Sequence, residues 1–284
     1  MVESHLDVGG AVTFWSLADW SDRARLQAEF GSIGLDAFMP EPRPAPACLK
    51  DALEDVLGGP RVLVRPLAAR DGFAVVREDR GLAANSYASV LTAWVRDGQQ
   101  PSFDPWSADA DLVAEAYRRQ QGRVPAGPLS GALVKVVEAF GGTRLRPGGA
   151  VYWVPGPRLD EWAQVAHAAE QASGGRPSAV YMLTHRLDAD AVRAVKDAVV
   201  QEVQVEANRI CNEVIAGDLG GRALETRKKQ AADLRAKVLL YEDLLNLGLA
   251  GLHRAVDKAD QAAATAALLL ATHGFADCQP VGVG

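Results

Sequence analysis

Residues 192–214 read VRAVKDAVVQEVQVEANRICNEV, and residues 231–259 read AADLRAKVLLYEDLLNLGLAGLHRAVDKA. In both stretches apolar residues recur every three or four positions, which places them along one face of an α-helix. The chain has no proline between residues 186 and 272, so nothing there removes a backbone donor from the interior of a helix. We therefore predict two long helices that form an antiparallel hairpin, with a break at residues 217–221.

The second predicted helix continues to about residue 270 and contains about 45 residues, which makes it roughly 65–70 Å long. A single small domain cannot cover an apolar stripe of that length. We expect the stripe to pack on the first helix and then on the rest of the chain or on a second copy. Gly248 and Gly251 indicate either a bend or the close approach of another helix. We assign self-association to seven residues of the stripe: Leu234, Val238, Tyr241, Leu245, Leu249, Leu252 and Val256.

The first 185 residues differ from this helical part, because short apolar runs, glycines and prolines alternate with helical stretches. The pattern predicts strands near 11–15, 61–67, 72–77, 86–96, 143–146, 150–154 and 178–183. It predicts helices near 16–33, 47–57, 108–121, 129–140 and 159–172. The expected class is α+β, with an N-terminal mixed α/β region that includes a winged-helix-like segment, followed by the long helical hairpin. The expected domains are 1–105, 106–185 and 186–284.

The segment 117–158 is basic, with seven Lys or Arg residues and one acid, Glu138, in a chain whose net charge is −6. Its order of helix, turn, helix and β-hairpin is that of a winged helix, in which the second helix enters the DNA major groove. Arg144 and Arg146 would lie on one face of a strand, where they could contact successive phosphates. The segment therefore predicts nucleic-acid contact by Arg118, Arg119, Arg123, Lys135, Arg144, Arg146 and Arg158.

A purely structural role is the alternative for this segment. The second helix reads LSGALVKVVEAF at 129–140 and has a single lysine, whereas a helix that reads bases needs an exposed face of Arg, Asn or Gln. Basic residues on a hairpin also discourage unwanted strand pairing at a sheet edge.

Four short stretches together resemble an uncharacterised bacterial and phage family. They are RVLVRPL at 61–67, DGFAVV at 71–76, TRLRPGGAVYWVP at 143–155 and YEDLLN at 241–246. The resemblance covers most of the chain and implies a mixed α+β head followed by a long helical tail. That family has no established activity, so the resemblance implies no catalytic residue.

Composition and motifs limit the remaining classes. With 48% hydrophobic and 23% charged residues, the 284-residue chain is typical of a folded protein with a sizeable core. It has no phosphate-binding loop and no HExxH or GxSxG motif. Its histidines are scattered, and its three cysteines form no CxxC pair, which favours a reducing cytoplasm. No apolar run is long enough to cross a bilayer. We expect a cytoplasmic protein without cofactor, metal site, catalytic motif or membrane contact.

Three functions remain open. The first is a non-enzymatic interaction or assembly protein that forms a homo-oligomer through the helical hairpin, with nucleic-acid contact as an optional activity. The second is a nucleic-acid-binding protein of a bacterial or phage system that uses the winged-helix-like module. The third is an enzyme whose site is assembled from distant residues. A deep pocket with two or more convergent ionisable groups would favour the third.

Overall fold

A computed structural model of the protein describes residues 9–68, 72–80, 85–95, 100–146, 148–217 and 219–276. The chain divides into two compact units. The bundle unit comprises Met1–Trp15, Val134–Ala166 and Val180–Gly284, and the meander unit comprises Ser16–Leu133 and His167–Ala179. Helices and antiparallel sheets occur together, and three long helices come last, so the predicted α+β class is confirmed. The division into domains 1–105, 106–185 and 186–284 stays a prediction.

The meander unit takes its name from a four-stranded antiparallel sheet in which consecutive strands are neighbours. Its strands are β3 (Val62–Pro66), β4 (Gly72–Arg80), β5 (Asn85–Trp94) and β6 (Ser102–Asp104). Helices α2 (Ala45–Leu57) and α3 (Ala108–Gln121) pack against each other, and α2 also packs on the sheet. Buried side chains such as Leu49, Val75, Leu91 and Val113 form the core between these elements. The strand β6, of three residues, was not predicted.

A second, two-stranded sheet in the meander unit pairs β2 (Trp20–Asp22) with β7 (Arg123–Pro125). Helix α1 (Arg23–Ser32) follows β2, and a short 3-10 helix, η2 (Asp36–Phe38), follows α1. The start predicted for this helix at residue 16 is wrong. The side chain of Asp22 accepts a hydrogen bond from the amide of Arg25 at 2.9 Å and caps the helix. The preceding residues are extended because they pair with β7.

The bundle unit contains a four-stranded sheet in the order β10-β1-β9-β8. Its strands are β1 (Gly10–Ser16), β8 (Thr143–Arg144), β9 (Tyr152–Pro155) and β10 (Ala179–His185). The hairpin predicted at 143–154 is confirmed, because Thr143 pairs with Trp153 and Arg144 with Tyr152. The unit also contains η3 (Gly156–Arg158), the C-terminal part of α4 (Ala126–Ala139) and the N-terminal part of α5 (Leu159–Gln171). The buried indole of Trp162 on α5 donates to the hydroxyl of Thr13 at 3.0 Å.

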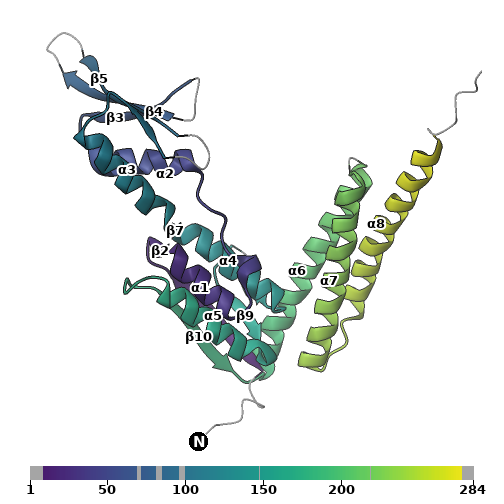
Figure 1. The fold of residues 1–284 in the computed structure, drawn as a ribbon. Coiled ribbons are helices and arrows are strands. Elements are labelled where there is room, and N and C mark those ends of the chain that lie inside the picture. Colours follow the sequence, from purple (N-terminus) through teal and green to yellow (C-terminus); the bar gives the residue numbers. More distant parts are fainter. Residues whose placement is uncertain are drawn as a thin grey trace, which may run out of the picture. The chain divides into compact units, whose positions relative to one another are not determined.

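Three long helices form the bundle that names the unit: α6 (Ala189–Ala216), α7 (Gly221–Leu245) and α8 (Ala250–Ala276). They run up, down and up again in Figure 1, and each packs on both others. The predicted hairpin is present as α6 and α7. The second helix, expected to be continuous to about residue 270, is instead two helices. Asn246, at φ 50°, takes the left-handed conformation that ends α7. A side chain on Gly248 or Gly251 would meet open space, so the close approach of another helix does not explain these glycines.

The core of the bundle contains all seven residues to which we assigned self-association. Their exposed fractions are 7% or less, and they pack with residues of α6 and α8 such as Val203, Ile210 and Ala259. The chain itself therefore covers these seven positions of the stripe, for which the sequence left open either the rest of the chain or a second copy. This removes the reason for assigning self-association to these residues. None of the described helices is long and apolar enough to span a membrane.

Candidate functional site

The seven basic residues predicted to contact nucleic acid are divided between the two units. Arg118, Arg119 and Arg123 belong to the meander unit, and the other four belong to the bundle unit. Helices α3 and α4 and strands β8 and β9 follow in the predicted order, but α3 and the hairpin lie in different units. The winged-helix-like grouping and its nucleic-acid contact therefore stay predictions.

Acidic neighbours bind three of the seven. Arg119 pairs with Glu115 at 2.7 Å in an exposed contact on α3. The guanidinium of Arg123 lies 4.0 Å from Asp55 and 4.3 Å from the centre of the Trp20 ring. Arg158 makes two hydrogen bonds to Glu161, at 2.7 and 2.9 Å.

A small cleft of about 340 Å³ in the meander unit also has charged walls, but its groups satisfy one another. Arg43 forms an ion pair with Asp51 and donates to the side-chain oxygen of Gln120 at 3.0 Å. The amide nitrogen of Gln120 donates to Asp55 at 2.6 Å. This chain of contacts ties α2 to α3, so we assign it a structural role.

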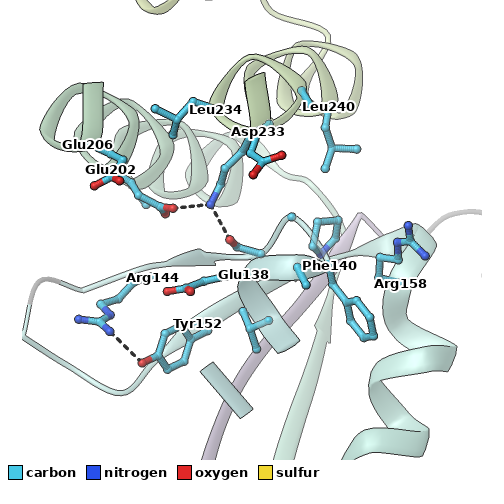
Figure 2. A pocket seen from close by; sticks show the side chains of 18 of the residues that line it. Glu138, Phe140, Arg144, Tyr152, Arg158, Glu202, Glu206, Asp233, Leu234 and Leu240 are labelled. Carbon is cyan, nitrogen blue, oxygen red and sulfur yellow. Dashed lines mark hydrogen bonds and ion pairs between the residues drawn. The ribbon is translucent and has the colours of Figure 1, made fainter. Parts of the chain in front are cut away.

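A larger cleft, of about 1010 Å³, lies within the bundle unit. It is formed by the end of α4, the β8–β9 hairpin and the turn at 155–158 on one side and by α6 and α7 on the other. Figure 2 shows Glu202, Glu206 and Asp233 on the helix side of β8, with Glu138 and Arg144 on the opposite side of that strand. Four acidic and four basic side chains line the cleft: Glu138, Glu202, Glu206, Asp233, Arg144, Arg158, Lys229 and Lys237.

Lys237 holds the two walls of the cleft together. Its ammonium group donates to the carbonyl oxygen of Gly142 at 2.6 Å and to one carboxylate oxygen of Glu202 at 2.5 Å. The other oxygen of Glu202 accepts a hydrogen bond from the hydroxyl of Thr143 at 2.6 Å. Lys237 and Glu202 therefore fix α7 and α6 against the sheet, and neither is available to a ligand without the loss of these bonds.

Glu138 and Asp233 are both exposed, and the carboxylates of these two acids of the cleft make no hydrogen bond or ion pair with any described residue. Partial removal from water raises the pKa of the Glu138 carboxyl above its ordinary value of 4.5, and the negative charges of Glu202 and Glu206 raise it further. Lys237 and Arg144 oppose this shift without cancelling it.

The hydroxyl of Tyr241 is an unsatisfied polar group beside this network. The side chain is fully buried, and its hydroxyl has no hydrogen-bond partner among the described residues. Burial raises the pKa of Tyr241, and the negative charge of Glu202 adds to the shift. A buried hydroxyl without a partner lowers stability.

The sequence indicated Arg144 and Arg158 for a different role and did not identify the other charged residues of the cleft, although a partial signal was present. Lys229, Asp233 and Lys237 are spaced by four on α7, and Glu202 and Glu206 are spaced by four on α6, so each set lies on one helix face. Nothing in the local pattern shows that these two faces meet the end of α4. Among the described residues, no group of three or more His, Cys, Asp or Glu side chains could hold a metal ion.

Ionisable groups that converge in a cleft are a feature of enzyme sites. Most of the ionisable groups in this cleft neutralise one another through the contacts described above, and the cleft also has apolar walls. Such an arrangement can bind an amphipathic ligand.

Comparison with known proteins assigns the chain to a family but does not assign a function. No curated protein and no solved structure matches the chain significantly. The sequence profile of a family described as "Family of unknown function (DUF6744)" matches residues 8–273. This match confirms the resemblance to an uncharacterised family, and the chain therefore belongs to the DUF6744 family of unknown function.

Proposed function

We propose that the protein is an interaction protein that self-associates through the C-terminal turns of α8. One observation carries the proposal: the apolar seam of α8 extends beyond the part that the described residues cover. Leu252, Val256, Ala259 and Ala263 follow one another at helical spacing, and none is more than 2% exposed. Leu270 lies seven residues further along the same face, and 45% of it is exposed.

Other large apolar side chains lie at the same end of the bundle. Leu268 on α8 is 66% exposed, and Ile215 at the end of α6 is 75% exposed. Figure 1 shows the C-terminal ends of α6 and α8 at this end of the bundle, with the last turns of α8 diverging from α7. Single exposed apolar residues are common, but a group of them marks a surface that binds a partner.

A second copy of the chain is the partner that best fits this surface. The exposed seam continues the stripe that already packs helix on helix within the bundle, so an identical seam offers the matching spacing. Two copies related by a two-fold axis would each supply the same patch and would bury it completely.

The mass of the full chain in solution tests this proposal. Size-exclusion chromatography with light scattering should give a multiple of 30.2 kDa at micromolar concentration. The variant Leu268→Glu/Leu270→Glu should elute as a monomer, because Leu270→Glu places a charge in the dry seam and Leu268→Glu removes apolar surface from the adjoining exposed face of α8. Leu239→Glu is the matched control, since Leu239 lies on α7 and is also exposed, at 54%. It should leave the mass unchanged.

Two results would contradict the proposal. A monomeric unmodified protein at micromolar concentration would exclude self-association under these conditions. An oligomer that survives Leu268→Glu/Leu270→Glu would place the interface elsewhere. Thermal unfolding of each variant shows whether a change of mass reflects the interface or loss of the fold.

A further inference from the structure

Strand β10 is an outer strand of the four-stranded sheet of the bundle unit. Among the described strands only β1 pairs with it. The backbone groups of a strand point alternately to its two sides, so those of β10 that point away from β1 have no partner strand in the described part of the chain. One edge of β10 is therefore available to another extended chain.

The other outer strands of the two four-stranded sheets are protected against such pairing, whereas β10 is not. Strand β3 ends in Arg65 and Pro66. Strand β6 has three residues and is followed by Pro105, and β8 has two residues, one of which is Arg144. Short strands, prolines and charged residues are common means by which proteins keep a sheet edge from pairing. The sequence of β10, AVYMLTH, contains no proline, lysine, arginine or acid.

Large apolar side chains lie beside this edge. Tyr181 is 47% exposed and Leu183 is 51% exposed, and side chains two residues apart lie on the same face of a strand. The ring of Tyr181 stacks on the half-buried ring of Phe14 in β1, with 4.9 Å between the ring centres. A partner whose apolar side chains cover these groups would remove them from water, which stabilises the complex.

The strand is held in place before any partner binds. The hydroxyl of Thr13 in β1 donates to the carbonyl oxygen of Tyr181 at 2.9 Å, and the same hydroxyl accepts a hydrogen bond from the buried indole of Trp162 at 3.0 Å. These bonds tie β10 to β1 and to α5. The binding of a partner therefore costs little ordering of β10 itself.

A single extended segment fits this edge better than a second folded copy of the chain. The seven residues of β10 give an edge about 23 Å long, and a sheet is about 10 Å thick. Two rigid copies that met only along this edge would bury roughly 460 Å² in total, whereas a specific interface between folded proteins buries about 1,200–2,000 Å². A flexible segment can pair with the edge and also place its side chains over Tyr181 and Leu183.

We infer that β10 binds an extended, uncharged polypeptide segment of a partner protein, which joins the sheet as a fifth strand and has apolar residues at every second position. Its backbone would bond to the open edge, and its apolar side chains would cover Tyr181 and Leu183. A charged segment fits less well, because β10 contains no Asp, Glu, Lys or Arg to neutralise it. The site lies apart from the C-terminal turns of α8, so the inference does not rest on self-association.

A model peptide tests the inference on the full chain: an acetylated and amidated heptapeptide of alternating threonine and valine. Its matched control is the same peptide with every backbone nitrogen methylated, which keeps the side chains but has no amide donor. At millimolar concentration the unmethylated peptide should slow amide hydrogen exchange within residues 179–185 by at least about tenfold, because open amides become hydrogen-bonded. It should bind at least about tenfold more tightly than the methylated peptide.

Two variants locate the site. Leu183→Lys places a charge beside the edge and should weaken binding of the unmethylated peptide at least about tenfold. Val205→Lys is the matched control, because Val205 lies on α6 and is also exposed, at 63%. It should leave the affinity unchanged. Amide exchange of each variant without peptide shows whether the fold is retained.

Each alternative result overturns the inference. Equal affinities of the two peptides would show that the backbone edge is not recognised, and unchanged exchange within residues 179–185 would show that β10 takes no added strand. Slowed exchange in α8 instead of β10 would show that the peptide follows apolar surface only. An affinity that Leu183→Lys leaves unchanged would place the site elsewhere. Exchange within residues 179–185 that slows as the protein alone is concentrated would assign the edge to a second copy.

Discussion

Glu242 near the end of α7 accepts a hydrogen bond from the backbone amide of Leu249 at 2.6 Å, just before α8 begins. Its second carboxylate oxygen lies 2.8 Å from the ring nitrogen Nε2 of His253. One side chain therefore joins both sides of the turn that reverses the chain. This turn brings α8 back over the apolar stripe of α7. The hydrogen bonds of Glu242 therefore help to hold α8 in the position where it covers that stripe.

Replacement of Glu242 by Gln should lower the stability of the bundle and reduce its sensitivity to acid. The amide of Leu249 and then His253 lower the pKa of Glu242 below 4.5. A carboxyl with a lowered pKa in the folded state stabilises above its ordinary value, and this contribution is lost as the pH falls through the lower value. Thermal unfolding at pH 7 and pH 3 measures both effects.

Asp243→Asn is the control for this prediction, because Asp243 is the exposed neighbour of Glu242. It should change the melting temperature little at either pH. Equal effects of Glu242→Gln and Asp243→Asn would show that the charge of the turn matters and the hydrogen bond to Leu249 does not.

The helical pattern predicted the bundle well and its turn badly. Apolar spacing identified the buried faces of α6, α7 and α8, since burial follows the three-to-four repeat. The same spacing continues through Asn246 to Leu249 without a change of phase, so periodicity alone could not show the break. Asn followed by Gly at 246 and 248 was the available sign, because both residue types tolerate the left-handed conformation.

Leu252→Ala should lower the free energy of unfolding by about 2–5 kcal/mol, because it leaves a cavity in the core of the bundle. Leu252 is 2% exposed and packs among α6, α7 and α8. The exposed Leu239 is the control, and Leu239→Ala should change stability by less than about 0.5 kcal/mol. Urea unfolding measures both. If Leu252→Ala and Leu239→Ala both change the free energy of unfolding only slightly, α8 does not cover the stripe.

The cleft could not be predicted, for a reason that does not apply to the bundle. Helix faces follow from spacing within one segment, whereas Glu138, Glu202 and Lys237 come from α4, α6 and α7. The prediction of a basic surface over 117–158 did not include the acids of α6, which line the same cleft as Arg144. The net charge of a segment counts only its own residues. It does not include charged residues from distant parts of the sequence that lie next to the segment in the folded protein.

Glu138→Gln should raise the stability of the protein at pH 7. A carboxyl with a raised pKa in the folded state opposes folding when it is charged, so the stability of the unmodified protein should fall as the pH rises from 4.5 through the higher value. Both states bind the proton below 4.5, so the advantage of Gln should vanish there. Urea unfolding between pH 4 and pH 8 checks this. A variant that is less stable than the unmodified protein at pH 7 would mean that Glu138 has a stabilising partner.

Tyr241→Phe should raise the free energy of unfolding by about 1 kcal/mol, because it removes a buried hydroxyl that has no partner among the described residues. Tyr152→Phe is the control, since the hydroxyl of Tyr152 accepts a hydrogen bond from Arg144. That variant should be neutral or slightly destabilised. Destabilisation by Tyr241→Phe would show that its hydroxyl is bonded, for example to an ordered water.

Nucleic-acid contact by the β8–β9 hairpin makes a separate prediction. Arg144 and Arg146 are both exposed, and each contact to a phosphate contributes about 0.9 to the slope of log affinity against log salt. Arg144→Ala/Arg146→Ala should therefore weaken binding to DNA of any sequence and lower the slope by about 2. Arg193→Ala is the control, because Arg193 is an exposed arginine that pairs with Asp190 and is not among the seven predicted contacts. Gel retardation at several salt concentrations measures the affinity for DNA and its salt dependence. If the unmodified protein retards no DNA at low salt, the predicted contact is ruled out. An unchanged slope in Arg144→Ala/Arg146→Ala would instead show that the hairpin does not touch the phosphates, since counterion release depends on the number of neutralised charges and not on their sequence context.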